Sequence, residues 1–182
     1  QGAALSVSRP HPLWSEQKTA KKKQATDQAM QALAAKHDLQ QVKALGLTGQ
    51  MHGATLLDNQ RQVLRPAILW NDGRIYSLCL ALEQAVPQSR QITGNLMMPG
   101  FTAPKLKWVA EHEPDIFSRV DKVLLPKDYL RFLISGDFAS DMSDATRTMW
   151  LNVAKRDWSD EMLAACGLNR QHMPTLFEGS QI

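Results

Sequence analysis

Apolar residues recur along the chain with two different periods. Between positions 15 and 37 they fall at Ala25, Ala29, Met30 and Leu33 after a polar start, which is the spacing of one helix face. Elsewhere they form short runs bounded by glycine, proline or turn residues, which is typical of strands. The pattern predicts strands at 3–8, 42–48, 54–58, 67–70, 122–125, 136–140 and 149–153, and further helices at 75–84, 102–113, 126–130 and 160–166. Because strands and helices alternate, the sequence predicts an α/β fold.

Local chemistry sets several of the predicted boundaries. Thr102 is expected to cap its helix, and Pro104 is tolerated in the first turn. Gly167 occupies the position just past the end of the last helix, where a left-handed residue is usual. Residues 58–61 have turn chemistry and predict a hairpin to 62–65.

The two ends of the chain look like interior points of a longer sequence. The chain begins at Gln1 and enters the strand-like run 3–8 at once, and it stops at Ile182 shortly after a Gly-Ser pair. We therefore expect residues 1–182 to form one domain that is incomplete at both ends.

Composition and charge narrow the classes of function. Of the 182 residues, 43% are hydrophobic and 21% are charged, the balance of a soluble globular chain and not of a disordered one. The net charge of +3 comes partly from Lys21, Lys22 and Lys23, and no aromatic residues interleave with this run to stack bases. We interpret the run as a solvated helix face and expect no nucleic-acid partner.

The cysteines and the apolar runs bear on the compartment. Cys79 and Cys166 are far apart and match no metal or redox spacing, so both are expected to be buried small apolar residues in a reducing cytoplasm. No apolar run is long enough to span a membrane. Residues 1–12 are polar and lack the apolar core of a signal peptide. The sequence predicts a cytoplasmic protein without a membrane segment.

The first candidate site is the loop Gly49-Gln50-Met51-His52-Gly53, between two predicted strands. Flanking glycines let the backbone turn tightly and approach a ligand closely. Met51 and His52 would then stand at a strand end, where open α/β sheets bind ligands. The imidazole of His52 offers a donor and an acceptor suited to sugar hydroxyls or a carbonyl. The alternative is a histidine that makes a structural hydrogen bond.

The second candidate site is Trp70-Asn71-Asp72-Gly73-Arg74. An aromatic ring beside an amide, a carboxylate and a guanidinium is typical of a polyol pocket, because the ring packs on C–H groups while the polar groups bind hydroxyls. The alternative is a helix start at which Asn71 or Asp72 caps and Trp70 packs in the core.

Other chemical groups are less informative. Asp137, Asp141 and Asp144 lack the central glycine and closing glutamate of a calcium loop, so turn and capping roles are expected. Neither a phosphate-binding loop nor a dinucleotide fingerprint occurs in the sequence. The remaining histidines are scattered and form no metal-ligand spacing. No catalytic centre and no metal site is visible in this chain.

The first loop, followed by Leu57-Asp58, closely resembles the sugar-binding signature of xylulokinases, members of the carbohydrate kinase family that includes glycerol kinase. Further blocks agree in order: 8–10, 14–17, 68–74, 92–95, 100–106, 125–130 and 140–145. The resemblance covers nearly all of the chain. It is specific, because glycerol kinases carry Arg-Glu at the position of Met51-His52.

This resemblance implies a fold of two actin-like (ribonuclease H-like) α/β domains, with sugar and MgATP in the cleft between them. It implies transfer of the γ-phosphoryl group of ATP to the 5-hydroxyl of D-xylulose. This chain would be the first, sugar-binding domain. By that analogy Met51 and His52 contact the sugar, and Trp70, Asn71 and Asp72 line the same pocket. A homodimer is compatible with the resemblance.

The departures from the family pattern concern catalysis. The phosphate-binding turn of the type Asp-x-Gly-Thr-Ser has no counterpart here, and the catalytic aspartate of the family would follow Ile182. We expect no catalytic, nucleotide-binding or metal-binding residue in this chain and no turnover by it alone. Lys22-Lys23 replaces a usual Trp-Trp pair, and Arg147 stands where a small residue is usual. A related pentulose or polyol kinase, or a non-catalytic sugar-binding module, is the alternative.

Overall fold

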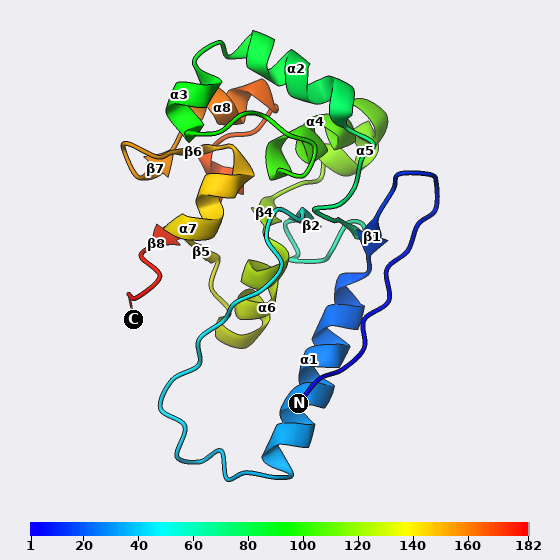
Figure 1. Ribbon diagram of the computed structural model, residues 1–182, viewed down its shortest axis with the longest axis vertical. Helices are drawn as coiled ribbons and strands as arrows, with labels where there is room; N and C mark the ends of the chain where they lie inside the picture. Colours follow the sequence, from blue (N-terminus) through cyan, green and yellow to red (C-terminus); the bar gives the residue numbers. More distant parts are fainter. Residues whose placement is uncertain (182) are drawn as a thin grey trace.

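The computed structural model describes residues 1–181, and Figure 1 shows the arrangement of its elements. The helices are α1 (Thr19–Ala34), α2 (Tyr76–Ala85), α3 (Ser89–Thr93), α4 (Thr102–His112), α5 (Pro114–Phe117), α6 (Pro126–Ser135), α7 (Met142–Ala145) and α8 (Asp160–Ala165), with 3-10 turns η1 (Thr146–Thr148) and η2 (Arg170–His172). The strands are β1 (Glu16–Gln17), β2 (Thr55–Leu57), β3 (Ala67–Ile68), β4 (Lys122–Leu124), β5 (Ala139–Asp141), β6 (Leu151–Asn152), β7 (Asp157–Trp158) and β8 (Thr175–Phe177).

The strands pair two by two within the described residues. β1 pairs with β3, β2 with β4 and β6 with β7, all antiparallel, and β5 pairs in parallel with β8. In the β2–β4 pair, Leu56 lies opposite Val123. Strands and helices are interspersed along the chain, as the sequence predicts.

The main hydrophobic core lies at one end of the molecule. Helices α2, α3, α4, α5 and α8 gather there in Figure 1. Trp150, Leu106, Ile75 and Met162 are each at most 1% exposed in this core. Helix α1 lies at the opposite end and contacts α6. Residues 35–53 lead away from α1 and return past α6, with which they line an open groove.

Most predicted elements are confirmed within a few residues. The helices expected at 15–37, 75–84, 102–113, 126–130 and 160–166 correspond to α1, α2, α4, α6 and α8. Gly167 has a φ of +74° just past α8, as expected of a helix stop. The turn at 58–61 forms around Asp58, whose carboxylate accepts hydrogen bonds from the N–H groups of Gln60 and Gln62. Both cysteines are buried and unpaired, which confirms that prediction.

Two predicted strands are wrong. Residues 42–48 are irregular, and Val42 and Leu45 are each 56% exposed. Of residues 3–8, only Ser8 forms a bridge, to Glu16. A strand requires a neighbour to accept and donate its backbone hydrogen bonds, and no strand among residues 1–181 lies beside 42–48. An apolar pattern alone does not supply that neighbour.

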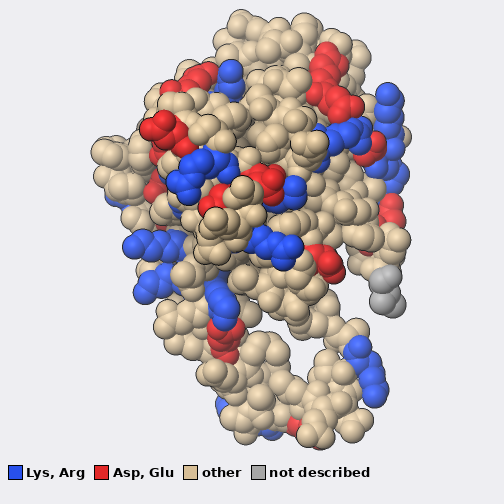
Figure 2. Space-filling model, turned by 180° about the vertical axis from the view of Figure 1, so that it is seen from behind, with Lys and Arg blue, Asp and Glu red and all other residues tan. Residues whose placement is uncertain are grey.

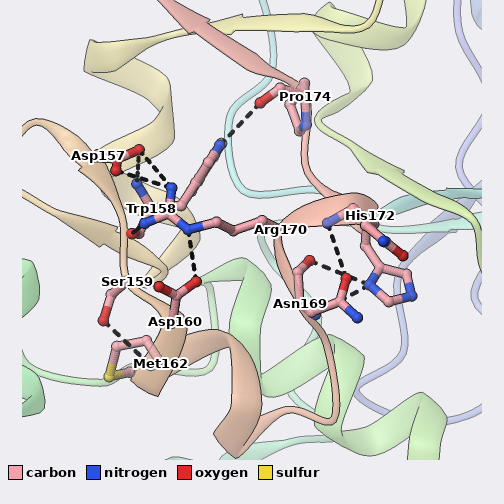
Figure 3. A network of polar contacts seen from close by, with 10 residues as sticks. Asp157, Trp158, Ser159, Asp160, Met162, Asn169, Arg170, His172 and Pro174 are labelled. Carbon is pink, nitrogen blue, oxygen red and sulfur yellow. Dashed lines mark hydrogen bonds and ion pairs between the residues drawn. The ribbon is translucent and has the colours of Figure 1, made fainter.

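The C-terminal part is held together by Arg170, as Figure 3 shows. Its guanidinium binds Asp157 at 2.9 Å and Asp160 at 2.7 Å, and it donates to the carbonyl of Trp158 at 2.7 Å. The indole of Trp158 in turn donates to the carbonyl of Pro174 at 2.9 Å. These contacts join β7 to the segment that leads into β8.

The molecular surface carries both signs of charge. On the face seen in Figure 2, Lys and Arg side chains lie interspersed with Asp and Glu side chains. Of the helices in residues 1–181, none combines the length and the apolar character needed to cross a membrane.

Candidate functional site

The loop at 49–53 is shaped by two backbone features. His52 takes the left-handed conformation, with a φ of +65°, which histidine adopts more readily than most residues. Gly53 has an ordinary φ, but a Cβ atom there would lie 2.5 Å from Cγ of Pro126. The glycine is therefore needed for the close approach of the loop to the start of α6, whereas the histidine makes the turn.

The imidazole of His52 is positioned but has a free nitrogen. Its ring packs edge-on against Phe101, with the ring centres 5.0 Å apart. Its Nε2 atom is buried and finds no hydrogen-bond partner among residues 1–181. Burial, followed by the charges of Lys105 and Arg147, lowers the pKa of His52 to about 4, against the opposing charge of Asp144. The ring is therefore neutral near pH 7 and can donate to or accept from a hydroxyl.

The carbonyl of His52 is held by helix α4. The hydroxyl of Thr102 donates to it at 3.2 Å. Thr102 was expected to cap α4, and this is wrong, because the helix is preceded by Phe101 and has no side-chain cap. The hydroxyl of Thr102 makes a contact over 50 residues of sequence instead.

The lysine run on α1 is only partly solvated. Lys21 and Lys23 are exposed, and Lys23 pairs with Asp27 four residues on at 2.6 Å. Lys22 is 6% exposed, and its Nζ donates to Oε1 of Gln50 at 2.5 Å. Burial lowers the pKa of Lys22 to about 8. The interpretation of the run as a solvated face is therefore wrong for Lys22, which ties α1 to the loop.

The second candidate site divides into exposed and buried side chains. Trp70 is 55% exposed and Asn71 is also exposed. Asp72 is 2% exposed, and its carboxylate accepts hydrogen bonds from the backbone N–H of Ser15 at 2.6 Å and from Arg74 at 2.7 and 2.9 Å. Trp70 and Asn71 are open to a ligand, while both carboxylate oxygens of Asp72 have protein donors.

Beneath Trp70, Arg74 is the centre of a buried ionic and aromatic network. It binds Glu16 at 2.8 Å as well as Asp72, and Glu16 also binds Arg65 at 2.5 Å. The guanidinium of Arg74 lies 3.6 Å from the ring centre of Trp14, so the cation is also stabilised by the aromatic face. This network fixes the loop that carries Trp70.

The two candidate sites meet at Gly100. A methyl group on Gly100 would lie 3.1 Å from the carbonyl oxygen of Trp70 and 3.8 Å from Nδ1 of His52. Thus the imidazole of His52 and the backbone carbonyl of Trp70, 18 positions apart in sequence and on separate loops, both lie close to one glycine. Met51, 44% exposed, is next to His52 on the same loop. The structure places the imidazole of His52 near the backbone of Trp70 and leaves Met51, Trp70 and Asn71 exposed, whereas Asp72 is turned into the buried ionic network.

The acidic cluster near α7 is occupied by a lysine. Lys127 binds Asp141, and also Asp128 at 3.2 Å and Asp144 at 3.1 Å. Asp141 accepts from the N–H of Asp144 at the start of α7, which confirms the capping role expected of it. The three carboxylates raise the pKa of Lys127 against the effect of burial.

The described residues do not fit a site for the Mg²⁺ ion that accompanies ATP. Within residues 1–181, no three His, Cys, Asp or Glu side chains are grouped so that they could hold a metal ion. The carboxylates near α7 already neutralise Lys127. We therefore derive no chemical step through ATP or Mg²⁺ from these residues.

Comparison with known proteins identifies the family. Residues 1–182 match the N-terminal domain of the FGGY family of carbohydrate kinases. The chain belongs to this family. It is 70% identical over 182 residues to the xylulose kinase of Escherichia coli strain K12. The aligned region covers all of this chain and 38% of that protein. The chain thus spans well under half the length of this relative.

Solved structures of the family share the fold. A xyloylose kinase from Brucella ovis is 55% identical, with a TM-score of 0.95 over 97% of this chain and 38% of the other. A glycerol kinase from Plasmodium falciparum with ADP, 19% identical, has a TM-score of 0.84 over 96% of this chain and 37% of the other, which shows the fold alone. The predicted actin-like first-domain fold of a sugar kinase is confirmed.

Three features of the site were not predicted from the sequence: the burial of Lys22 against Gln50, the contact of Thr102 with His52, and a second buried lysine, Lys105, on α4. The only signal for Thr102 and Lys105 was their place in the block 100–106 that resembles the family. Arg147, whose role the sequence left open, is exposed, and its charge contributes to the lowered pKa of His52.

Proposed function

We propose that the protein containing this chain transfers the γ-phosphoryl group of ATP to the 5-hydroxyl of D-xylulose, and that this chain supplies the surface that binds the sugar. In this proposal Met51 and His52 contact the sugar from one loop, and Trp70 and Asn71 contact it from another. ATP and Mg²⁺ would be held by other parts of the complete enzyme. The cytoplasm is the proposed compartment.

The observation that supports this proposal is that the imidazole of His52 and the backbone carbonyl of Trp70 both lie next to Gly100. The buried, unpartnered imidazole nitrogen of His52 can bind a hydroxyl of a polyol, and the half-exposed indole of Trp70 can pack on its C–H groups. Since the imidazole is neutral near pH 7, it can bind a hydroxyl as donor or acceptor without placing a charge in the pocket.

Asp72 has a different part in this proposal from that expected of it. Because its carboxylate is saturated by Ser15 and Arg74, we propose that it positions Trp70 and makes no contact with the sugar. Binding energy then comes from the two loops above the ionic network.

The test uses the complete kinase and four acceptors: D-xylulose, D-ribulose, L-ribulose and glycerol. The expected result is the highest kcat/KM for D-xylulose. His52→Ala is expected to raise KM for the sugar roughly tenfold or more, because the buried imidazole that binds a sugar hydroxyl is removed. It is expected to leave KM for ATP within about twofold of the wild-type value. A preference for another acceptor would refute D-xylulose as substrate. Equal effects on both KM values would refute sugar contact by His52.

A further inference from the structure

Lys105 is a fully buried cation whose partners are all backbone carbonyls. It lies on α4 and is 0% exposed. Its Nζ donates to the carbonyl of His52 at 3.0 Å, to that of Phe101 at 2.8 Å and to that of Gly100. Within residues 1–181 it forms no ion pair with a carboxylate, unlike Lys127. Three ammonium donors thus meet three acceptors, which satisfies the group completely.

Burying a lysine in this way has a high free-energy cost if the residue has only a structural role. Burial lowers the pKa of Lys105 to about 7, although the charge of Asp72 opposes this. A buried charge destabilises a fold unless its hydrogen bonds are all made, and a well-packed apolar residue of similar volume is often as good. The positions of the three carbonyl acceptors indicate a role for Lys105 beyond packing.

The three carbonyls belong to two loops that are far apart in sequence. His52 lies in the loop 49–53, and Gly100 and Phe101 lie in the segment that enters α4. The held carbonyl of His52 belongs to the residue with a φ of +65°, and Thr102 donates to the same oxygen. Gly100 lies next to both the imidazole of His52 and the backbone carbonyl of Trp70. One ammonium group therefore joins the backbone of the loop 49–53 to the segment that enters α4 and lies next to the backbone of Trp70.

We propose that Lys105 is a positioning residue for sugar recognition, which fixes the backbone of His52 against Gly100 through its three carbonyl hydrogen bonds. The proposal rests on the proposed sugar-binding function of this surface. It assigns to Lys105 an effect on the sugar and none on the nucleotide, because its carbonyl partners lie in the loop 49–53 and in the segment that enters α4 beside that loop.

The first test compares two lysines of the same helix in the complete kinase. Lys105→Met removes the ammonium and keeps the length of the side chain. Lys107→Met is the matched control, since Lys107 is one third exposed and, among residues 1–181, forms an ion pair only with Glu111, at 3.5 Å. We expect Lys105→Met to raise KM for the sugar by roughly 10- to 100-fold, as a displaced binding group does. The KM of Lys105→Met for ATP should stay within about twofold of the wild-type value. The KM values of Lys107→Met for the sugar and for ATP should also stay within about twofold of the wild-type values.

The second measurement needs no turnover. In isotope-labelled kinase, Lys105→Met is expected to shift the backbone NMR signals of 50–53 and 100–101, while Lys107→Met leaves them in place. Thr102→Val, which keeps the lysine and removes the other donor to the His52 carbonyl, is expected to move the signals of 51–53 and to raise the sugar KM by roughly three- to tenfold. Thr102→Val tests the proposal if Lys105→Met does not fold.

The outcomes separate the two proposals. If the wild-type enzyme prefers another acceptor, the D-xylulose assignment fails, and the same KM comparison with that acceptor still tests Lys105. If Lys105→Met folds with unchanged loop signals, or raises the two KM values equally, the positioning role is overturned whatever the substrate. If Thr102→Val leaves both the signals and the sugar KM unchanged, holding the His52 carbonyl has no effect on binding, and the role is likewise overturned.

Discussion

Asp72→Asn is the substitution that best separates a sugar contact from a supporting residue. The change keeps the shape of the side chain and removes its charge. In the structure both carboxylate oxygens face protein donors, namely the N–H of Ser15 and the guanidinium of Arg74, and the side chains of Asp72 and Arg74 are 0% and 2% exposed. The variant therefore weakens a buried ion pair and removes nothing that faces the pocket.

The size of the effect follows from this geometry. Loss of one partner of a buried ion pair typically costs about 3–5 kcal/mol, since the other charge remains buried. Arg74 keeps Glu16 at 2.8 Å, and the asparagine oxygen can still accept from Ser15. We therefore expect the lower end, a decrease of about 3 kcal/mol in the free energy of unfolding.

The assay is urea-induced unfolding of the complete kinase, followed by tryptophan fluorescence, together with steady-state kinetics below the transition. Asp27→Asn is the control, because Asp27 and its partner Lys23 are about half exposed and such a pair contributes at most about 1 kcal/mol. The sugar KM of Asp72→Asn should stay within about threefold of the wild-type value. A stability within 0.5 kcal/mol of wild type with a sugar KM raised tenfold would refute this reasoning and make Asp72 a sugar contact.

Three further predictions concern the loop. Gly53→Ala should lower the free energy of unfolding by about 1–3 kcal/mol in urea titration, because its Cβ would lie 2.5 Å from a proline at the start of α6, whereas Gly46→Ala, with open space around it, should be neutral. Because the folded pKa of His52 is about 4, below its ordinary 6.5, the unfolded chain binds its proton more tightly. Stability should therefore fall by about 1–2 kcal/mol between pH 6.5 and 4 after allowance for solvent screening, and His52→Asn should flatten that part of the pH profile; an unchanged profile contradicts the assignment. Lys22→Met should raise the sugar KM roughly threefold, since Gln50 loses its hydrogen-bond partner. Lys21→Met is the control and should leave the sugar KM unchanged. Equal effects of the two variants would mean that Lys22 has no more influence on the loop than a solvated lysine.

The sequence predicts the local elements of this chain better than their partners. Helices such as α2 and α6 follow from periodicity, proline and glycine, which act within a few residues. The run 42–48 has the apolar pattern of a strand and remains irregular, because a strand depends on a neighbour that local sequence does not encode. The same limit applies to Thr102, whose hydroxyl suits a helix cap and binds a carbonyl 50 residues away instead.

The candidate site shows the same division. Residue type and glycine spacing were sufficient to single out His52 and Trp70, whose imidazole and backbone carbonyl, respectively, the fold places next to Gly100. By contrast, the carboxylate of Asp72 is buried and not exposed like Trp70, because it accepts hydrogen bonds from Arg74 and from the distant Ser15. The burial of Lys105 could not be predicted either, because a lysine on an amphipathic helix is ordinarily solvated, and its three carbonyl partners come together only in the folded chain.

The most direct test of the central claim is an NMR titration of the complete kinase with D-xylulose in the absence of ATP. The observed signals are the indole N–H of Trp70, assigned by its loss in Trp70→Phe, and the imidazole of His52. We predict that both shift with D-xylulose at concentrations at which glycerol has little effect, while the indole of the buried Trp150 does not move. Binding of D-xylulose with shifts elsewhere and none at Trp70 and His52 would contradict the assignment of this surface as the sugar site.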